Sequence, residues 1–158
     1  MAIFVPPIKS QGIKTKLVPW INDLILRSGI TPQSKWIEPF FGTGVVGLNA
    51  PITGEHIVGD INPHIINFYK AVYDGQITPY TMRAYLEHAN KMLSAAPEDG
   101  YTYYREVKNR FNKEHELHDF IFLSRAGFNG MMRFNKKGEW NVPFCKKPER
   151  FAPAYITK

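Results

Sequence analysis

Three glycines and a downstream aspartate are spaced in this chain as a site for an adenosine-containing ligand requires. Residues 38–47 read Glu-Pro-Phe-Phe-Gly-Thr-Gly-Val-Val-Gly, which puts Gly42, Gly44 and Gly47 at Gly-x-Gly-x-x-Gly spacing. Glycine lets the main chain turn sharply after a strand and lets a ligand come close to it. Asp60 ends the next apolar run, where a carboxylate can accept hydrogen bonds from both hydroxyls of a ribose.

An acidic residue before these glycines helps to distinguish between the possible adenosine-containing ligands. Glu38 lies at the expected strand end, where its carboxylate can sit near the cationic amino-acid part of S-adenosylmethionine (SAM). A dinucleotide would instead need its pyrophosphate on the N-terminus of the following helix. The pattern favours SAM, but a dinucleotide stays open, as does an ordinary strand-to-helix turn followed by a surface aspartate.

A second group of residues has the chemistry of DNA recognition. Residues 124–135 read Ser-Arg-Ala-Gly-Phe-Asn-Gly-Met-Met-Arg-Phe-Asn, and the two glycines are expected to open a loop after a helix. Arginine can pair with guanine and asparagine with adenine in the major groove, and an exposed Phe or Met can wedge between bases. The expected DNA contacts are Arg125, Phe128, Asn129, Met131 and Arg133, with Lys136 and Lys137 behind them for phosphates.

The charge distribution points to the same region. The chain has 20 Lys and Arg residues, of which eight lie in residues 120–158. Of its 14 Asp and Glu residues, two lie there. Residues 1–119 therefore hold 12 basic and 12 acidic residues. The whole net charge of +6 therefore belongs to the last quarter of the chain. A localised basic surface is what phosphate binding requires. The alternative is a solvated basic face with the Phe and Met side chains in a core.

The first 75 residues are expected to position the glycine turn. Their helical and strand-like patterns alternate in the order that opens a parallel α/β sheet. The expected elements are a helix over 16–27, strands over 35–38 and 55–59, the start of a helix over 45–49, and a helix from Pro63 to near Gly75, capped by Asn62. The side chains expected to face inward from the last helix are Ile65, Ile66, Tyr69 and Val72.

A boundary is expected near residue 76, so that residues 76–158 form a second, mainly helical part that reads DNA. Helices are expected after Thr78, around residues 104–111 and around residues 117–125, with a break at 97–100. A β-hairpin is expected over 132–144, around Asn-Lys-Lys-Gly at 135–138. Its Trp140, Val142 and Phe144 alternate along the second arm.

Taken in order, these motifs resemble the Dam-type adenine-N6 DNA methyltransferases, and within them the branch of the EcoRV modification methyltransferase. The resemblance covers nearly the whole chain and is carried by residues 6–16, 38–44, 59–64, 128–135 and 138–148. It implies a partial Rossmann-like, SAM-dependent methyltransferase sheet with an inserted, mainly helical DNA-recognition domain and a β-hairpin. It also implies double-stranded DNA as partner and a site-specific enzyme of the restriction-modification type.

The resemblance also assigns roles to single residues. Lys14 aligns with a lysine that contacts SAM in the family, and Lys9 with one placed near DNA. Ser10 stands where the family usually has Trp, and Ile13 where it has Gly. Phe128 falls on the intercalating aromatic, and Asn129, Met131 and Arg133 on the recognition loop. Together with Glu38, the expected cofactor contacts are Ser10, Lys14, Phe40, Gly42, Gly44 and Asp60.

The family's catalytic motif, Asp-Pro-Pro-Tyr, occurs nowhere in the sequence, whose one Pro-Pro pair follows Val5. The exocyclic amine of adenine is a poor nucleophile, and it must be extruded from the duplex and held by polar acceptors and an aromatic stack. No catalytic residue is therefore assigned. We expect the N-terminal part of a longer enzyme, inactive alone, whose missing C-terminal part would be its partner.

Two other classes of function remain as alternatives. The chain can be a non-catalytic DNA-binding protein, or one half of a split methyltransferase. A dinucleotide-dependent oxidoreductase would have no use for a basic hairpin. One cysteine, Cys145, allows no internal disulfide and no Cys-rich zinc site, so no metal is expected. No run approaches the roughly 18 apolar residues of a membrane helix, and a reduced cytoplasmic setting fits best.

Overall fold

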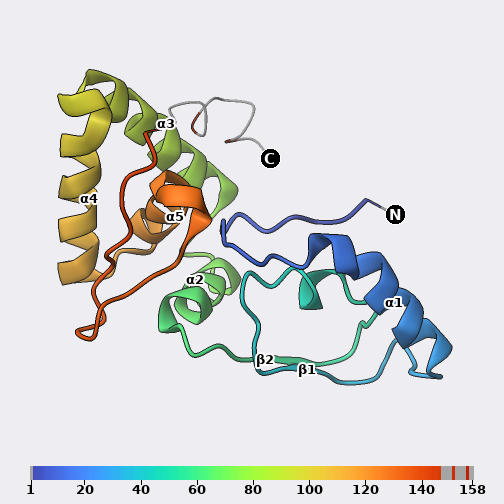
Figure 1. The fold of residues 1–158 in the computed structure, drawn as a ribbon. Coiled ribbons are helices and arrows are strands. Elements are labelled where there is room, and N and C mark those ends of the chain that lie inside the picture. The colour runs from blue at the N-terminus through green and yellow to red at the C-terminus, as the bar shows by residue number, and fades with distance from the viewer. Residues whose placement is uncertain (1, 147–150, 152–155, 157–158) are drawn as a thin grey trace. The chain divides into compact units, whose positions relative to one another are not determined.

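The computed structural model describes residues 2–146, 151 and 156. It shows a mixed α/β chain whose contacts fall into two compact units (Figure 1). The first unit comprises Met1–Pro6 and Gly12–Ile66, and the second comprises Pro7–Gln11 and Asn67–Lys158. The functional boundary expected near residue 76 stays a prediction, whereas the contacts change their grouping after Ile66, ten residues earlier.

The first unit opens with the expected helix. α1 (Val18–Arg27) follows a 3-10 turn over Thr15–Leu17 and carries Pro19 in its first turn. Proline is tolerated there because its missing N–H would have no partner inside the helix anyway. Val18 and Ile25 are the buried side chains of the helix.

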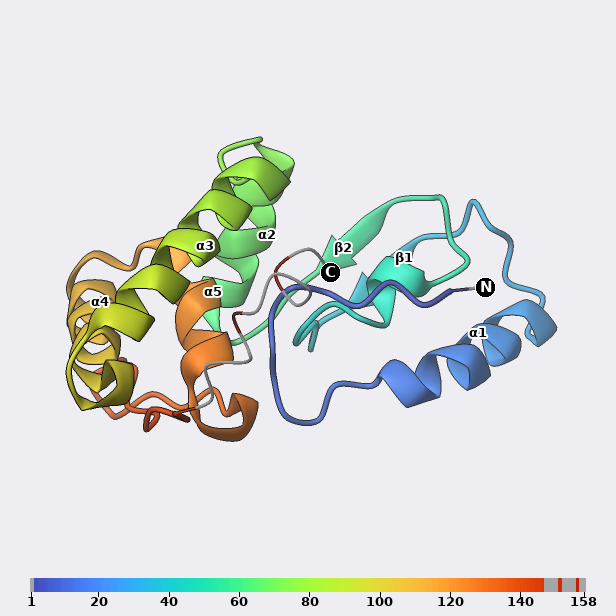
Figure 2. The same cartoon turned by 90° about the horizontal axis from the view of Figure 1, so that it is seen from above.

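The two expected strands form a small parallel sheet. β1 (Trp36–Glu38) pairs with β2 (His56–Val58) (Figure 2). In the register Ile37 lies opposite Ile57. The strands are short: β1 ends at Glu38, and β2 ends two residues before Asp60. The sheet therefore brings the glycine turn after β1 next to the acid after β2.

The helix expected to start over 45–49 does not develop. Gly47–Asn49 forms one 3-10 turn, and Ala50 is already extended, with φ −63° and ψ 138°. The next residue is Pro51, which has no N–H to continue the helix and disfavours helical geometry in the residue before it. The proline therefore limits this segment to a single turn.

α2 (Pro63–Tyr73) is present as expected, but its buried face differs in part from the prediction. The side chain of Asn62 accepts a hydrogen bond from the backbone N–H of His64 at 3.0 Å and caps the helix. Ile65 is buried as expected, whereas Val72 is exposed, and the other buried apolar side chains are Phe68 and Ala71. Steps of three residues place Phe68 and Ala71 on one stripe with Ile65.

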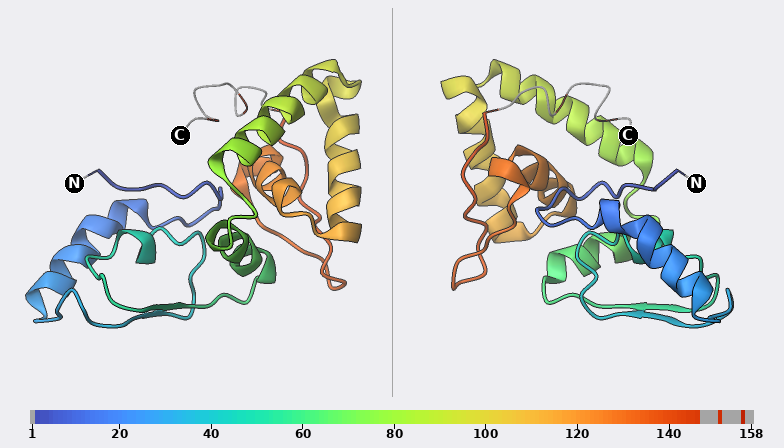
Figure 3. Two further views of the ribbon diagram at one scale, coloured as in Figure 1. Left: turned by 180° about the vertical axis from the view of Figure 1, so that it is seen from behind. Right: turned by 45° about the vertical axis from the view of Figure 1, so that its right-hand side comes forward.

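Besides the end of α2, the described part of the second unit includes three complete helices that pack around an aromatic core. They are α3 (Pro79–Ala95), α4 (Tyr101–Glu114) and α5 (Leu117–Ala126), shown from two sides in Figure 3. Thr78 and Thr81 form a capping box at the start of α3. The expected break before α4 is a 3-10 turn over Glu98–Gly100. The largest fully buried side chains of this unit include Tyr104, Phe111, Phe120, Phe122 and Trp140.

The expected hairpin forms its turn but not regular strands within the described residues. Phe134 and Trp140 make an isolated antiparallel bridge, and Trp140 and Val142, which alternate along the second arm, are both buried. Asn112 of α4 donates to the carbonyl of Trp140 and accepts from its N–H, at 3.2 and 2.7 Å. Tyr104 donates to the carbonyl of Val142 at 2.7 Å. Side chains of α4 thus satisfy backbone groups that a strand ladder would otherwise pair.

In the described part of the chain, no helix combines the length and the apolar character needed to cross a membrane. Nor do the His, Cys, Asp and Glu side chains of that part gather in a group of three that could hold a metal ion.

Candidate functional site

The glycine turn is held between the ends of the two strands. The N–H of Phe41 donates to the carbonyl of Gly59 at 2.8 Å, and the N–H of Gly59 donates to the carbonyl of Glu38 at 2.9 Å. Gly42 and Gly44 have φ angles of +56° and +80°, which residues with a side chain rarely adopt. These two glycines are therefore required by the course of the main chain itself.

Asp60 is bound directly to this turn. Its Oδ2 accepts the N–H of Gly42 at 2.7 Å, and its Oδ1 accepts the N–H of Asn62 at 2.8 Å. An ionised carboxylate has about four acceptor positions, so both oxygens can still accept a further hydrogen bond. The structure thus brings together the glycine turn and the acid that the sequence predicts for a ribose.

The carboxylate of Glu38 lies against the backbone of Gly47, the third glycine of the motif. Trp36 Nε1 donates to Glu38 Oε2 at 3.0 Å, and the backbone of Gly47 also donates to this carboxylate. A Cβ on Gly47 would come within 2.6 Å of Glu38 Oε2, so only glycine leaves room for the acid. Burial raises the pKa of Glu38 above its usual range, and the bonds from Trp36 and Gly47 lower it only in part.

These contacts answer a question that the sequence leaves open. The spacing alone does not tell whether Gly47 belongs to the motif or is a chance match, and it says nothing of Trp36. A tryptophan two residues before the acid, on the same side of a strand, is the signal that could have indicated this hydrogen bond.

The other predicted cofactor residues are less closely tied to the turn. Phe40 projects from it with 88% of its surface exposed. Lys14 is exposed in the same unit, and its amine donates to the carbonyl of Gly12 at 3.2 Å. Ser10 belongs by its contacts to the second unit. Their contacts with a cofactor stay predictions.

The predicted recognition loop follows α5 directly. Residues Phe128–Gly130 form a 3-10 turn, fixed where the N–H of Phe128 donates to the carbonyl of Pro143 at 2.8 Å. Phe128 is 46% exposed, and Asn129 is exposed with a φ of +51°. Met131 is half-buried. The loop therefore presents an aromatic ring and an amide at the surface, as the prediction requires.

Lys9 lies beside this loop although it precedes Phe128 by 119 positions in the sequence. The N–H of Gln11 donates to the carbonyl of Gly130 at 3.0 Å, and the N–H of Lys9 donates to Ser124 Oγ at 3.5 Å. A Cβ on Gly130 would lie 3.2 Å from Lys9 Cγ. The structure thus joins two predicted groups of DNA contacts on one surface.

The predicted arginines differ in their settings. Arg133 is exposed, and it donates to the side-chain and backbone oxygens of Asn141 at 2.8 and 2.9 Å, which ties the two arms of the hairpin. Lys136 and Lys137 are exposed at its tip. Arg125 lies in the last turn of α5 rather than in the loop, and burial lowers the pKa of its guanidinium.

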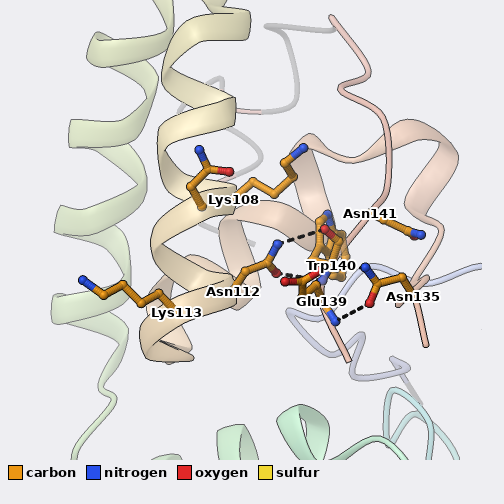
Figure 4. A pocket seen from close by; sticks show the side chains of 8 residues that line it. Lys108, Asn112, Lys113, Asn135, Glu139, Trp140 and Asn141 are labelled. Carbon is orange, nitrogen blue, oxygen red and sulfur yellow. Dashed lines mark hydrogen bonds between the residues drawn. The ribbon is translucent and has the colours of Figure 1, made fainter. Parts of the chain in front are cut away.

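An open polar pocket of about 650 Å³ lies between α4 and the hairpin (Figure 4). Its lining residues are Lys108, Asn109, Asn112, Lys113, Asn135, Glu139, Trp140 and Asn141. The four residues from α4 recur at helical spacing and so share one face. The charge count misses the two lysines because the acids of residues 1–119 balance them; their spacing is the signal that could have found them.

Comparisons with known proteins agree with the predicted class. The family described as D12 class N6 adenine-specific DNA methyltransferase matches residues 10–157. A DNA adenine methylase of Haemophilus influenzae is 32% identical over 160 residues, covering 92% of this chain and 54% of the relative. A DNA adenine methylase of Vibrio cholerae is 36% identical over 119 residues, with 71% and 40% covered.

A third relative comes from a virus. The DNA N-6-adenine-methyltransferase of Escherichia phage P1 is 34% identical over 129 residues, which cover 77% of this chain and 16% of that protein. The chain thus spans about half, or less, of the length of the relatives it matches.

Proposed function

Because the chain belongs to the D12 class of N6 adenine-specific DNA methyltransferases, we propose that it supplies the SAM-binding turn and the DNA-reading surface of a site-specific adenine-N6 methyltransferase. The observation that carries this proposal is the linked geometry of Glu38, Gly42 and Asp60 after two parallel strands. The finer assignments to the EcoRV branch, to a restriction-modification system and to a Rossmann-like sheet belong to the same proposal.

The groups on both sides of the turn fit SAM. Asp60 keeps acceptor positions for a ribose diol. Glu38 offers a carboxylate for the cationic amino-acid part, and because burial raises the pKa of Glu38, a nearby positive charge would stabilise its ionised form. When bound, SAM would supply an activated methyl group. The turn between the two acids would hold the adenosine end and orient the cofactor.

The second unit fits a DNA substrate. An enzyme that modifies a base must take that base out of the stack, and the exposed ring of Phe128 can fill the space left behind. Arg133 and Asn129 are suited to base edges. Lys9, Lys136 and the lysines of the pocket beside α4 are suited to phosphates.

No residue of the chain is assigned to the methyl-transfer step. Holding the adenine amine needs acceptors of the Asp-Pro-Pro-Tyr kind, and the sequence contains no such motif. We therefore propose that the complete reaction belongs to a longer polypeptide, with these residues as its cofactor-binding and DNA-reading parts.

Calorimetric titration with SAM tests the cofactor assignment. The wild-type chain should release or take up heat on binding, and Asp60→Ala should abolish the signal. Asp60→Asn, which keeps one acceptor for a backbone N–H of the turn, should weaken binding less. Asp23→Ala, at an exposed acid of α1 paired with Arg27, is the control and should bind like the wild type. If the wild-type chain bound DNA but gave no heat of binding with SAM, the chain would instead be a non-catalytic DNA-binding protein. A heat of binding with NADH would support an oxidoreductase.

A further inference from the structure

The segment Pro7–Gln11 makes its contacts in a different unit from its neighbours on both sides. Residues up to Pro6 and from Gly12 onward group with the glycine turn, whereas Pro7–Gln11 groups with α3, α4 and α5. Within the segment Ile8 is almost completely buried. The segment is therefore a packed strap of the second unit, covalently continuous with the first unit at both ends.

The strap is bound to the end of the recognition loop. The backbone bond from Gln11 to Gly130 fixes the last residue of the Phe128–Gly130 turn. Gly130 has a φ of +67°, and a Cβ there would press on Lys9. A side chain at residue 130 would therefore strain the loop backbone and require the Lys9 side chain to shift.

We propose that this strap couples cofactor binding to DNA binding, with Gln11 and Gly130 as positioning residues. The inference rests on the proposed function, which places a cofactor contact at Lys14, three residues after Gln11. A cofactor that restrains Lys14 also restrains Gln11, and through its N–H the position of Gly130 and the exposed ring of Phe128. The free energy of ordering the loop is then shared between the two ligands.

Such coupling has a defined signature. If the cofactor raises the affinity for DNA by some factor, DNA must raise the affinity for the cofactor by the same factor, and factors of roughly 5–150 are typical. A purely structural strap would change the stability of the chain without producing this reciprocal factor.

Inserting two glycines between Gly12 and Ile13 tests the proposal with the full chain. The insertion keeps the strap contacts, the predicted cofactor residues and the predicted DNA contacts, but makes the connection between Gln11 and Lys14 longer and more flexible. The same insertion after Gly29, an exposed position at the end of α1, is the matched control. The affinity for S-adenosylhomocysteine is measured by calorimetry, with and without DNA. The affinity for a labelled pool of short duplexes with a randomised centre is measured by fluorescence anisotropy, with and without S-adenosylhomocysteine.

The wild type and the Gly29 insertion should show the same reciprocal factor, at least roughly fivefold. The Gly12 insertion should keep each separate affinity while the factor falls to one. Gly130→Ala should reduce the factor as well and serves if the insertion fails to fold. A factor that persists in both variants would overturn the proposal, as would a wild-type chain that binds both ligands independently. Absence of cofactor binding in the wild type would overturn the proposed function together with it.

Discussion

At the scale of single residues, the third glycine and Glu38 explain each other. The carboxylate can occupy its half-buried place only because Gly47 has no side chain, and burial raises its pKa. The folded chain therefore binds this proton more tightly than the unfolded chain does. The stabilising contribution is complete below the ordinary pKa of 4.5 and is lost as the pH rises through the higher folded pKa.

Glu38→Gln should flatten this part of the pH dependence. Glutamine keeps an acceptor for Trp36 and Gly47 but cannot ionise, so the free energy of unfolding should fall less between pH 4.5 and neutral pH than in the wild type. Urea unfolding at a series of pH values measures it. Glu55→Gln, an exposed acid paired with Lys35, is the control. Equal slopes for Glu38→Gln and the wild type would contradict the assignment.

Two basic residues of the hairpin should differ in what they contribute to DNA binding. Arg133→Ala should relax discrimination at one base pair by about 1–3 kcal/mol, if its guanidinium reads a base edge. Lys136→Ala should weaken all sequences alike and reduce the salt slope by about one. Selection from a randomised duplex library, followed by affinities at several salt concentrations, separates the two effects.

A further variant is needed to separate base reading by Arg133 from its structural role in the hairpin. Because Arg133 also ties the hairpin through Asn141, its loss can act by loosening the hairpin. Asn141→Ala removes the side-chain part of this tie and leaves the guanidinium free to reach DNA. If Asn141→Ala relaxed discrimination as much as Arg133→Ala, the role of Arg133 would be structural rather than base-reading.

At the scale of elements, the sequence predicts what depends on neighbours in the chain. The capping box of α3 and the Asn62 cap of α2 are local, and both helices start where expected. The missing strand ladder of the hairpin has a non-local cause, because its partners Tyr104 and Asn112 come from α4, at sequence separations of 38 and 28. The same holds for Lys9 beside Gly130, which only the fold brings together.

The packing of the three helices around Asp119 is another feature that no local pattern predicts. Asp119 is only 1% exposed, and it accepts two hydrogen bonds from Arg110 of α4, at 2.8 and 2.6 Å, and one from Tyr85 of α3. Arg110 is partly exposed, with 42% of its side chain accessible. The cluster therefore joins α3, α4 and α5 through a buried charge.

The two partners of this ion pair should respond unequally to substitution. Arg110→Ala leaves a buried carboxylate without its cation and should cost about 3–5 kcal/mol of stability at neutral pH. Asp119→Asn should cost less, because water can solvate the partly exposed guanidinium. Denaturant unfolding measures both, and Arg105→Ala, an exposed arginine on the same helix, should stay within about 1 kcal/mol. A larger loss for Asp119→Asn than for Arg110→Ala would contradict this account.

At the scale of the whole chain, the predicted cofactor site and the predicted DNA surface each rest on a short sequence pattern, and in the fold further residues join each of them. The glycine turn and its acids are adjacent in sequence or at the ends of paired strands, so their proximity could be predicted from the order of elements. The basic surface is larger than the local charge count indicates, because the lysines of α4 join it only through the packing of the hairpin on that helix.

The small sheet leaves apolar side chains at the surface of the first unit. Ile37 and Ile57 are partners in the parallel register and so face the same side, with 65% and 46% of their surfaces exposed. Parallel sheets are normally covered on both faces, and clustered exposed apolar side chains favour association. A chain of these 158 residues should therefore self-associate as its concentration rises.

Replacing both isoleucines should reduce that association. The double variant Ile37→Thr, Ile57→Thr keeps β-branched side chains that suit strands while removing apolar surface. In sedimentation equilibrium, its average mass should stay nearer the monomer value than that of the wild type over the same concentration range. Val5→Thr, at an exposed position of the same unit outside its helices and strands, should behave like the wild type. If the double variant associated as strongly as Val5→Thr, the uncovered face of the sheet would not be the surface that drives association, and the exposed side chains of α1 would become the next surface to test.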